Sequence, residues 1–428
     1  MPTAHTGQWR GKEKYQSVKD IPDGMVLCME YDFDQVLDRR NTNCEKWDYL
    51  EEHFGRADVL PMWVADMDFP SPPEVVQAIQ ERAKHPSYGY TGTSDSFFDS
   101  IVGWMDRRHG WAIEREWIST TPGVVPGLAA SVLAFTEPGD NVIVQSPVYP
   151  PFFRVVENNG RRLLNNELVR VGDRYEMDWD DLEAKLGEGA KLLLLCSPAN
   201  PVGRVWSEEE LARISEMCVA HGTVIASDEI HSDIIYSWAR HTPFGALSPE
   251  AAENSVTFVA PSKTFNVPGL STSVAIIPNS DLREGFNRVL SGLGLGTNLF
   301  GITALEAAYT YGDRWLDDAI AYIEENLRFM VEFLGRQVPE IRVVPPEGTY
   351  VIWLDCRGLG LDPDALHRFM VEEARVGLSD GTFFGLGGEG YQRINIACPR
   401  PILREGLERI ASAAVRLRGG VKGTKTGA

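Results

Sequence analysis

The pattern that most restricts the fold of this chain is a series of short apolar runs that alternate with helical patterns between residues 117 and 277. Several of the runs are continuously apolar, which is typical of strands covered on both faces. Such alternation predicts an α/β fold with a mostly parallel seven-stranded sheet between helices. The predicted strands are residues 117–121, 141–145, 162–168, 191–196, 223–227, 255–260 and 273–277.

The chain of 428 residues is longer than one ordinary hydrophobic core, so we expect two domains. Residues 61–300 carry the alternating pattern and are expected to form the large domain. Residues 301–418 carry long helical patterns and two further apolar runs, which favours a smaller α+β domain. The N-terminal segment 1–60 is expected to complete this small domain, and residues 59–69 to begin as a strand. The glycine- and lysine-rich tail 419–428 is expected to be disordered.

The composition argues against several kinds of partner. A formal net charge of −20 offers no basic face to nucleic acids or to anionic membranes. The N-terminus has no signal-peptide apolar core, and no apolar run approaches membrane-spanning length. The six cysteines show no metal-binding spacing, so we expect reduced thiols, no metal and a cytoplasmic location.

Two polar motifs follow predicted strands and point to one kind of chemistry. Asp228 ends one apolar run, and the pair Ser262-Lys263 follows the next. A buried lysine has a lowered pKa and can form an imine with an aldehyde, while a buried acid can keep a ring nitrogen protonated. Pyridoxal 5'-phosphate requires this division of labour. Taken singly, Asp228 is equally consistent with a helix N-cap, and Lys263 with an ordinary surface lysine.

Three more motifs lie at the carboxyl ends of predicted strands, where ligands bind in open α/β sheets. The turn at Gly123 precedes a helix, whose first N–H groups, including those of Val124, Val125 and Gly127, would face a phosphate. Tyr149 can stack on an aromatic ring. Asn200 lies between prolines and can donate to an oxygen. Each motif alone also fits a simple turn.

Together these stretches resemble the fold type I pyridoxal phosphate enzymes, the class I/II aminotransferase superfamily. The resemblance covers about residues 31–418 and is closest to the cystathionine β-lyase (Cβ–Sγ lyase) subgroup of the MalY/PatB type. The stretches that carry it are LPMWVADMDF at 60–69, YGYT at 88–91, DEIH at 228–231, SKTFN at 262–266 and RINIACPR at 393–400.

The resemblance implies a role for each matching residue. Lys263 would bind the cofactor covalently and transfer protons, Asp228 would pair with the ring nitrogen, and Asn200 would bond the phenolate oxygen. Arg393 would bind the substrate carboxylate in the bidentate manner that suits a guanidinium. The remaining implied residues are Tyr149, which stacks on the ring, Gly123, Val124, Val125 and Ser262 at the phosphate, His231 at the cofactor, Ala65 at the substrate, and Tyr90, contributed to phosphate and substrate by the neighbouring subunit of a homodimer.

The implied activity is α,β-elimination from L-cystathionine or a related L-cysteine S-conjugate, which yields a thiol, pyruvate and ammonia. The alternative is an aminotransferase acting on an L-amino acid and a 2-oxo acid. Two departures from ordinary transaminases favour the lyase: His231 stands where a tyrosine is common, and Ser271 where an arginine often holds the phosphate. Ala260 also lacks a hydroxyl that some relatives direct at the phosphate. A catalytically idle regulator of the same fold is a further alternative.

Overall fold

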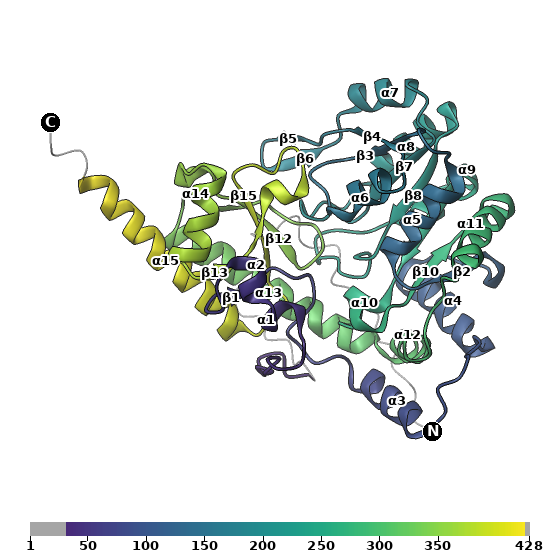
Figure 1. The fold of residues 1–428 in the computed structure, drawn as a ribbon, viewed down its shortest axis with the longest axis horizontal. Helices are drawn as coiled ribbons and strands as arrows, with labels where there is room; N and C mark the ends of the chain where they lie inside the picture. Colours follow the sequence, from purple (N-terminus) through teal and green to yellow (C-terminus); the bar gives the residue numbers. More distant parts are fainter. Residues whose placement is uncertain (1–30, 424–428) are drawn as a thin grey trace, which may run out of the picture.

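A computed structural model describes residues 31–423. Its central feature is a seven-stranded sheet in the order β2-β10-β9-β8-β7-β3-β4 (Figure 1). Only β10 runs antiparallel to its neighbours, so the expectation of a mostly parallel sheet is confirmed. The strands are β2 (Ile118–Thr121), β3 (Asn141–Val144), β4 (Arg162–Asn165), β7 (Leu192–Cys196), β8 (Val224–Asp228), β9 (Ser255–Val259) and β10 (Ser273–Ile276), one for each predicted run.

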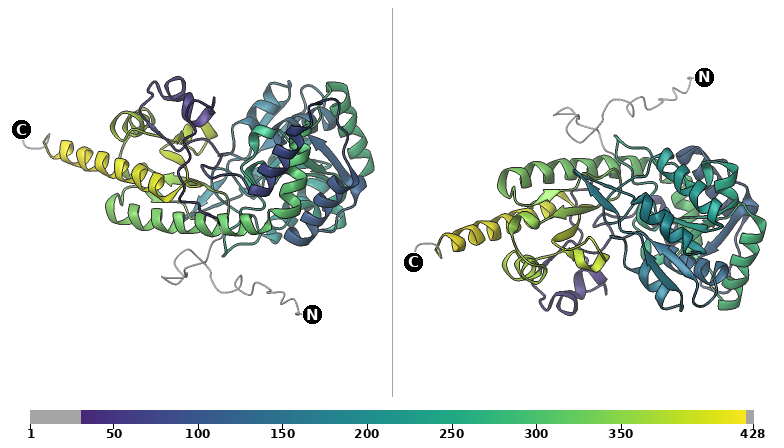
Figure 2. Two further views of the ribbon diagram at one scale, coloured as in Figure 1. Left: turned by 90° about the horizontal axis from the view of Figure 1, so that it is seen from below. Right: turned by 90° about the horizontal axis from the view of Figure 1, so that it is seen from above.

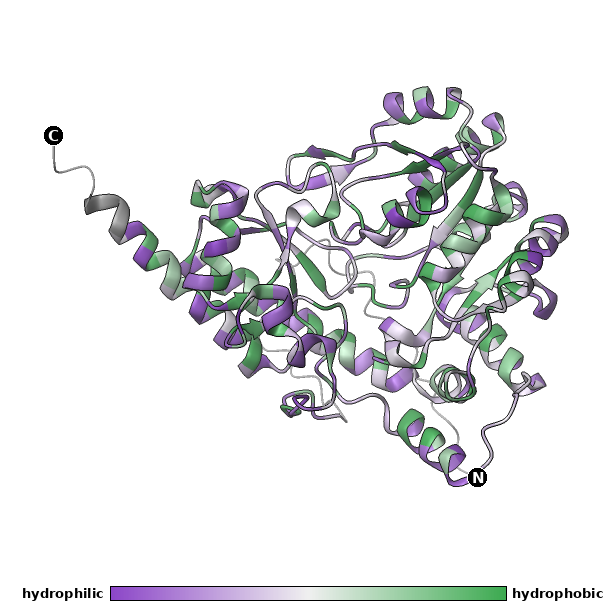
Figure 3. Ribbon diagram, in the orientation of Figure 1, coloured by the Kyte–Doolittle hydropathy of each residue, from purple (hydrophilic) through white to green (hydrophobic). Residues whose placement is uncertain are grey.

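Helices cover both faces of this sheet. Alternate residues of β7 belong to two different apolar clusters, Leu193 and Leu195 to one and Leu192 and Leu194 to the other. Hydrophobic residues accordingly concentrate in the strands of the sheet (Figure 3). The helices of this part are α5 (Val124–Phe135), α6 (Pro151–Glu157), α7 (Trp179–Gly187), α8 (Glu208–His221), α9 (Pro249–Glu253), α10 (Pro261–Thr264) and α11 (Ser280–Leu293).

A second part of the chain is built on a four-stranded antiparallel sheet, in the order β11-β12-β15-β14. Its long helices α13 and α15 lie side by side (Figure 2). Helix α15 continues to Gly423, into the segment expected to be a disordered tail. The elements are α13 (Asp313–Gln337), β11 (Arg342–Val343), β12 (Val351–Asp355), α14 (Pro363–Arg368), a π-helix (Phe369–Glu373), β13 (Val376–Gly377), β14 (Ser379–Asp380), β15 (Tyr391–Asn395) and α15 (Arg400–Gly423).

The N-terminal part of the described chain packs on this smaller sheet region. Helices α1 (Glu45–Asp48) and α2 (Leu50–Phe54) precede β1 (Leu60–Pro61), which pairs in parallel with β13. The strand expected from residue 59 is therefore only two residues long. Beyond it the backbone bonds to side chains: Asn395 donates to the Val64 and Asp66 carbonyls, and Asn266 donates to the Met67 carbonyl. These side-chain bonds replace a strand partner.

Three helices pack against one another beside the large sheet, and α4 (Asp95–His109) and α12 (Leu299–Tyr311) share an apolar cluster with its strands. Helix α3 (Pro73–Lys84) packs on α12, which also contacts α4. The connection between α3 and α4 is exposed along its whole length.

Within residues 31–423, no helix is long and apolar enough to cross a membrane. No group of acidic, histidine and cysteine side chains in this range could hold a metal, and its five cysteines are free.

A β-hairpin that the sequence did not predict joins the two parts. Strands β5 (Val169–Val171) and β6 (Arg174–Glu176) are short and half exposed, so no apolar run marks them. Arg170 of the hairpin donates to Asp355 at the end of β12, over 2.6 Å. Arg357 donates to the same carboxylate through two nitrogens, each over 2.8 Å.

This junction gives stability that depends on pH. Burial alone would raise the pKa of Asp355, but hydrogen bonds from Arg357 and Arg170 outweigh it and lower the pKa from 3.8 to about 2. The carboxylate therefore stabilises the fold by about 2 kcal/mol above pH 3.8, and this contribution disappears as the pH falls through 2. We expect Asp355→Asn to lower the free energy of unfolding by about that amount at pH 7, measured by urea denaturation. A variant as stable as the wild type would contradict the assignment.

Candidate active site

The sheet topology brings most of the predicted site residues to one edge. Strands β2, β9, β8, β7 and β3 run in the same direction, so their carboxyl ends open on the same side. Lys263 lies in α10, directly after β9, and is partly buried. Its Nζ donates to the carbonyl of Ala65 over 2.6 Å. Burial lowers the pKa of Lys263 to about 8, against the opposing charges of Asp66 and Asp228, so a larger fraction of its amine is unprotonated at neutral pH than in an ordinary lysine.

Asp228 is the last residue of β8 and only 4% exposed. Its Oδ1 accepts from the Ile230 N–H over 3.0 Å. Burial raises the pKa of Asp228 to about 7, although that N–H and the charge of Lys263 oppose the shift. No described residue forms an ion pair with Asp228. A buried carboxylate without a cation is costly, so this position suits a ligand that brings a positive charge.

Arg393 of β15 is a buried guanidinium, 6% exposed, that contacts only neutral acceptors among the described residues. It donates to Asn200 Oδ1 over 3.0 Å and to the Trp63 carbonyl over 2.8 Å. Its Nε has no partner within the described chain. Burial lowers the pKa of Arg393 to about 10. The position therefore suits a carboxylate ligand, and Asn200, whose oxygen is occupied, keeps its amide nitrogen to donate.

Two aromatic residues complete the centre of the site. Tyr149 follows β3 and is partly buried; burial and the charge of Asp228 raise its pKa, while Arg393 opposes the shift. His231 is buried and lies edge-on to Tyr350, with ring centroids 5.7 Å apart. Burial, then the charges of Lys263 and Arg393, lower the pKa of His231 well below its usual value. Its ring is thus neutral, and Nδ1 has no partner among the described residues.

The predicted phosphate turn precedes α5. Gly123 has φ 155° and ψ 161°, a conformation that essentially only glycine adopts. Val124 and Val125 begin the helix, where N–H groups lack an acceptor inside the helix. The expectation for Gly127 is wrong, because its N–H donates to the Gly123 carbonyl over 3.1 Å. Ser262, from α10, is partly buried at the same edge of the sheet.

The segment 63–66 crosses between the two parts and touches both ends of the site. The Trp63 carbonyl accepts from Arg393, and the Ala65 carbonyl accepts from Lys263 and, over 2.9 Å, from the Tyr350 hydroxyl. The sequence reading missed Tyr350. Tyr350 directly precedes the apolar residues of β12. In such a run, the sequence does not distinguish a tyrosine of the hydrophobic core from a tyrosine at a binding site.

Tyr90 is the one predicted residue that the structure leaves apart. It lies in the connection between α3 and α4 with a relative exposure of 113%, so its ring touches nothing in its own chain. The ring centroid of Phe384 lies 4.9 Å from the guanidinium carbon of Arg393. Tyr88, from the same connection as Tyr90, packs on Phe300.

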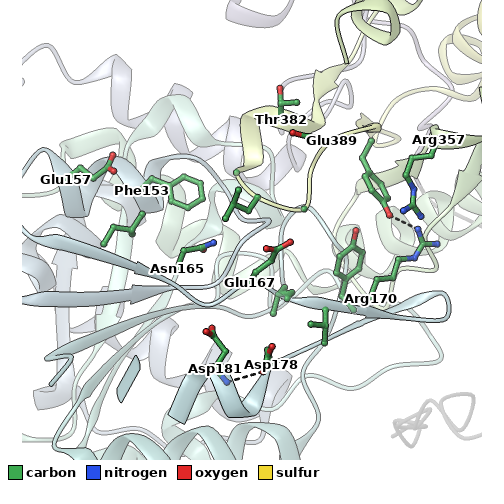
Figure 4. Close-up of a pocket in the computed structure, with 18 residues that line it drawn as sticks. Phe153, Glu157, Asn165, Glu167, Arg170, Asp178, Asp181, Arg357, Thr382 and Glu389 are labelled. Atoms are coloured by element: carbon green, nitrogen blue, oxygen red, sulfur yellow. Dashed lines mark hydrogen bonds between the residues drawn. The ribbon is translucent and has the colours of Figure 1, made fainter. Parts of the chain in front are cut away.

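A separate groove of about 1410 Å³ lies between the β5–β6 hairpin and the loop after β14 (Figure 4). Its lining includes Glu167, Arg170 and Glu389, with Leu386 and Gly387 from the loop that follows Phe384. Its lining includes neither Lys263 nor Asp228, so it is distinct from the candidate site.

Comparison with known proteins shows the family and the fold of the chain. Residues 57–410 match the family model described as aminotransferase class I and II. Cystathionine beta-lyase PatB of Bacillus subtilis (strain 168) is 46% identical over 383 residues, which cover 89% of this chain and 99% of that protein. Cystalysin from Treponema denticola, whose crystal structure contains a pyridoxal 5'-phosphate cofactor, is 38% identical with a TM-score of 0.88, over 91% of this chain and 100% of that one. A PLP-bound putative aminotransferase from Clostridium difficile 630 is 40% identical with a TM-score of 0.88, over 90% and 100%.

Proposed function

Because the chain belongs to the aminotransferase class I and II family, we propose that it is a pyridoxal phosphate-dependent carbon–sulfur β-lyase. It cleaves L-cystathionine or a related L-cysteine S-conjugate to a thiol, pyruvate and ammonia. One observation carries this proposal: two buried and uncompensated charges of opposite sign, Asp228 and Arg393, flank a lysine whose pKa is lowered to about 8. The similarity to PatB over nearly the full length of both chains supports the lyase activity.

The residues present fit the cofactor. Asp228, a buried acid without a cation, suits the ring nitrogen, and Lys263 suits the aldehyde carbon. When bound, pyridoxal phosphate supplies an electron-withdrawing ring that stabilises a carbanion at the substrate's α-carbon. The residues that we assign to the rest of the cofactor are Asn200 at the phenolate oxygen, Tyr149 against the ring, His231 beside it, and Gly123, Val124, Val125 and Ser262 at the phosphate.

Lys263 is assigned the proton transfers. A general base works best when its pKa is close to the operating pH, and burial brings the pKa of Lys263 to about 8. The Ala65 carbonyl, 2.6 Å away, accepts from the amine whenever that amine is free. The reaction removes the α-proton and then expels the thiol from the β-carbon, so this base must reach the α-carbon.

Arg393 is assigned the substrate α-carboxylate. We expect Arg393→Ala to raise KM by about 10²-fold with a smaller change in kcat, because a charge-assisted bidentate bond contributes about 3 kcal/mol. Steady-state kinetics with L-cystathionine measure this. Arg404→Ala, an exposed arginine on α15, is the matched control and should leave KM unchanged. An unaltered KM in Arg393→Ala would mean that another residue holds the carboxylate.

The second candidate function is an aminotransferase, which the likeness to the putative aminotransferase favours. His231 and Ser271 differ from the residues common in transaminases and favour the lyase. The two activities separate in one experiment: purified protein is incubated with L-cystathionine, and pyruvate is assayed with and without a 2-oxo acid. Pyruvate formed without the oxo acid supports the lyase, and product that requires the oxo acid refutes it.

We also propose a homodimer in which Tyr90 of one subunit reaches the phosphate and substrate of the other. The exposed connection that carries Tyr88 and Tyr90 supports this, since two tyrosines 58% and 113% exposed are unusual on a free surface. A monomer in sedimentation at micromolar concentration would contradict it. The five free cysteines of the described chain are in keeping with the reducing cytoplasm, where we propose that the protein acts.

A further inference from the structure

A second buried carboxylate lies behind the candidate site. Asp233, in the turn that follows β8, is 9% exposed. Its Oδ2 accepts from the Thr264 hydroxyl over 2.7 Å, and its Oδ1 accepts from the Trp104 indole N–H over 3.1 Å. His109 Nε2 lies 2.8 Å from the same Oδ1. Asp233 therefore connects α10 to α4, an element far away in the sequence.

A matching carboxylate and histidine lie next to this group. Glu229 is 1% exposed, and its Oε1 accepts from the Ser227 hydroxyl and from the Phe244 N–H, over 2.8 and 2.9 Å. His241 Nε2 lies 2.9 Å from its other oxygen. The rings of His109 and His241 meet edge to face, with centroids 6.1 Å apart. The two carboxylate–histidine pairs thus form one network whose two hydrogen-bonded halves meet at the imidazole rings.

The two ends of the network are placed where the proposed chemistry needs accuracy. Thr264 directly follows Lys263, and Glu229 directly follows Asp228. Helix α10 has only four residues and no side-chain cap, so contacts with the rest of the protein must fix its position. The hydrogen bond from the Thr264 hydroxyl to Asp233 ties α10 to the network, and Thr264 is completely buried.

We propose that this network, Thr264–Asp233–His109 with His241–Glu229, is a positioning framework that sets Lys263 relative to Asp228. Thr264 and Asp233 touch neither substrate nor cofactor; they act by orienting the lysine that does. The proposal rests on the proposed function, because it presumes that Lys263 and Asp228 hold the two ends of one cofactor. Each carboxylate oxygen of Asp233 and Glu229 has a hydrogen-bond partner. Movement of any of these groups would leave a buried acceptor unpaired, so the network resists displacement.

The test replaces the Thr264 hydroxyl and measures how the protein holds pyridoxal phosphate. The cofactor is removed from wild type, Thr264→Val and Thr264→Ser, and its rebinding is titrated by absorbance. We expect Thr264→Val to raise the dissociation constant about tenfold, because Asp233 loses a buried donor. The pH midpoint of the absorbance of the lysine-bound cofactor should also shift, while Thr264→Ser keeps both values close to those of the wild type.

The control is Thr223→Val, which removes another fully buried threonine hydroxyl. In the wild type, the Thr223 hydroxyl donates to the Ala190 carbonyl over 2.8 Å, at the end of β8 opposite to Asp228. We expect it to lower the melting temperature of the cofactor-free protein as Thr264→Val does, with cofactor affinity unchanged. Equal losses of affinity in both valine variants, or in Thr264→Ser, would overturn the proposal, as would a wild-type affinity in Thr264→Val.

A different result, obtained with Lys263→Ala, would refute the proposed function. If Lys263→Ala still acquires the absorbance of lysine-bound cofactor, the site assignment itself is wrong, whatever Thr264→Val does. If Lys263→Ala loses that absorbance and Thr264→Val matches the wild type in affinity and pH midpoint, the site stands and the positioning framework is refuted.

Discussion

Replacement of Lys263 by alanine is expected to abolish β-elimination and the long-wavelength absorbance that pyridoxal phosphate acquires on binding a lysine. Lys263 is the lysine that lies at the carboxyl edge of the sheet together with Asp228, and burial brings its pKa to about 8. Removal of its amine removes the base that we assign to the α-proton, and that step alone accounts for a loss of about 10²–10⁴-fold. Losing the covalent bond to the cofactor lowers the rate further.

Two controls separate this effect from general damage. Lys191→Ala, at the exposed start of the β7 segment and at the amino end of the sheet, should keep both activity and absorbance. Small primary amines added to Lys263→Ala should restore part of the turnover, because they can act as the missing base. An active Lys263→Ala protein with unchanged absorbance would remove the basis of the proposed function.

Three of the predicted site residues lie at one edge of the large sheet for a reason that the sequence contains: they end or follow apolar strands of a mostly parallel sheet. Lys263, Asp228 and Asn200 could be brought together by topology alone, since the carboxyl ends of such strands meet at one edge. No side-chain contact had to be known. The same reasoning identified all seven strands of the large sheet, of which β7, β9 and β10 are buried at every position and β3 and β8 at all but the first.

The residues that the sequence missed depend on how the two parts dock. Tyr350 reaches the Ala65 carbonyl because the chain before it is bonded to the large part, where the Glu347 N–H donates to the Gly203 carbonyl over 2.7 Å. Thr349 likewise donates its N–H to the Ile234 carbonyl. Contacts between residues so distant in the sequence leave no periodic signal. The length of the strand that begins near residue 60 was overestimated for the same reason. After Pro61 the backbone carbonyls of Val64 and Met67 accept from the side chains of Asn395 and Asn266, not from a neighbouring strand.

The second large effect is expected at Asp228. Asp228→Asn keeps the shape of the side chain and removes its charge, so a cationic ring nitrogen at this position would lose its partner. Breaking a buried ion pair costs about 3–5 kcal/mol, which corresponds to about 10²–10⁴-fold in kcat/KM when the cost falls on the transition state.

The comparison with Glu229→Gln makes this test specific to charge at the cofactor. Glu229 is the adjacent residue and also buried, but its carboxylate faces His241 and the Ser227 hydroxyl. Replacement of Glu229 by glutamine should lower the melting temperature and change kcat/KM much less than Asp228→Asn.

Because burial raises the pKa of Asp228 to about 7 in the protein alone, the bound cation must also lower that pKa for the carboxylate to stay charged. Cofactor affinity of the wild type should therefore fall more steeply below pH 7 than that of Asp228→Asn, because only the wild type has this carboxylate to protonate. A pH-independent wild-type affinity, or an Asp228→Asn enzyme of full activity, would show that this carboxylate does not hold the ring.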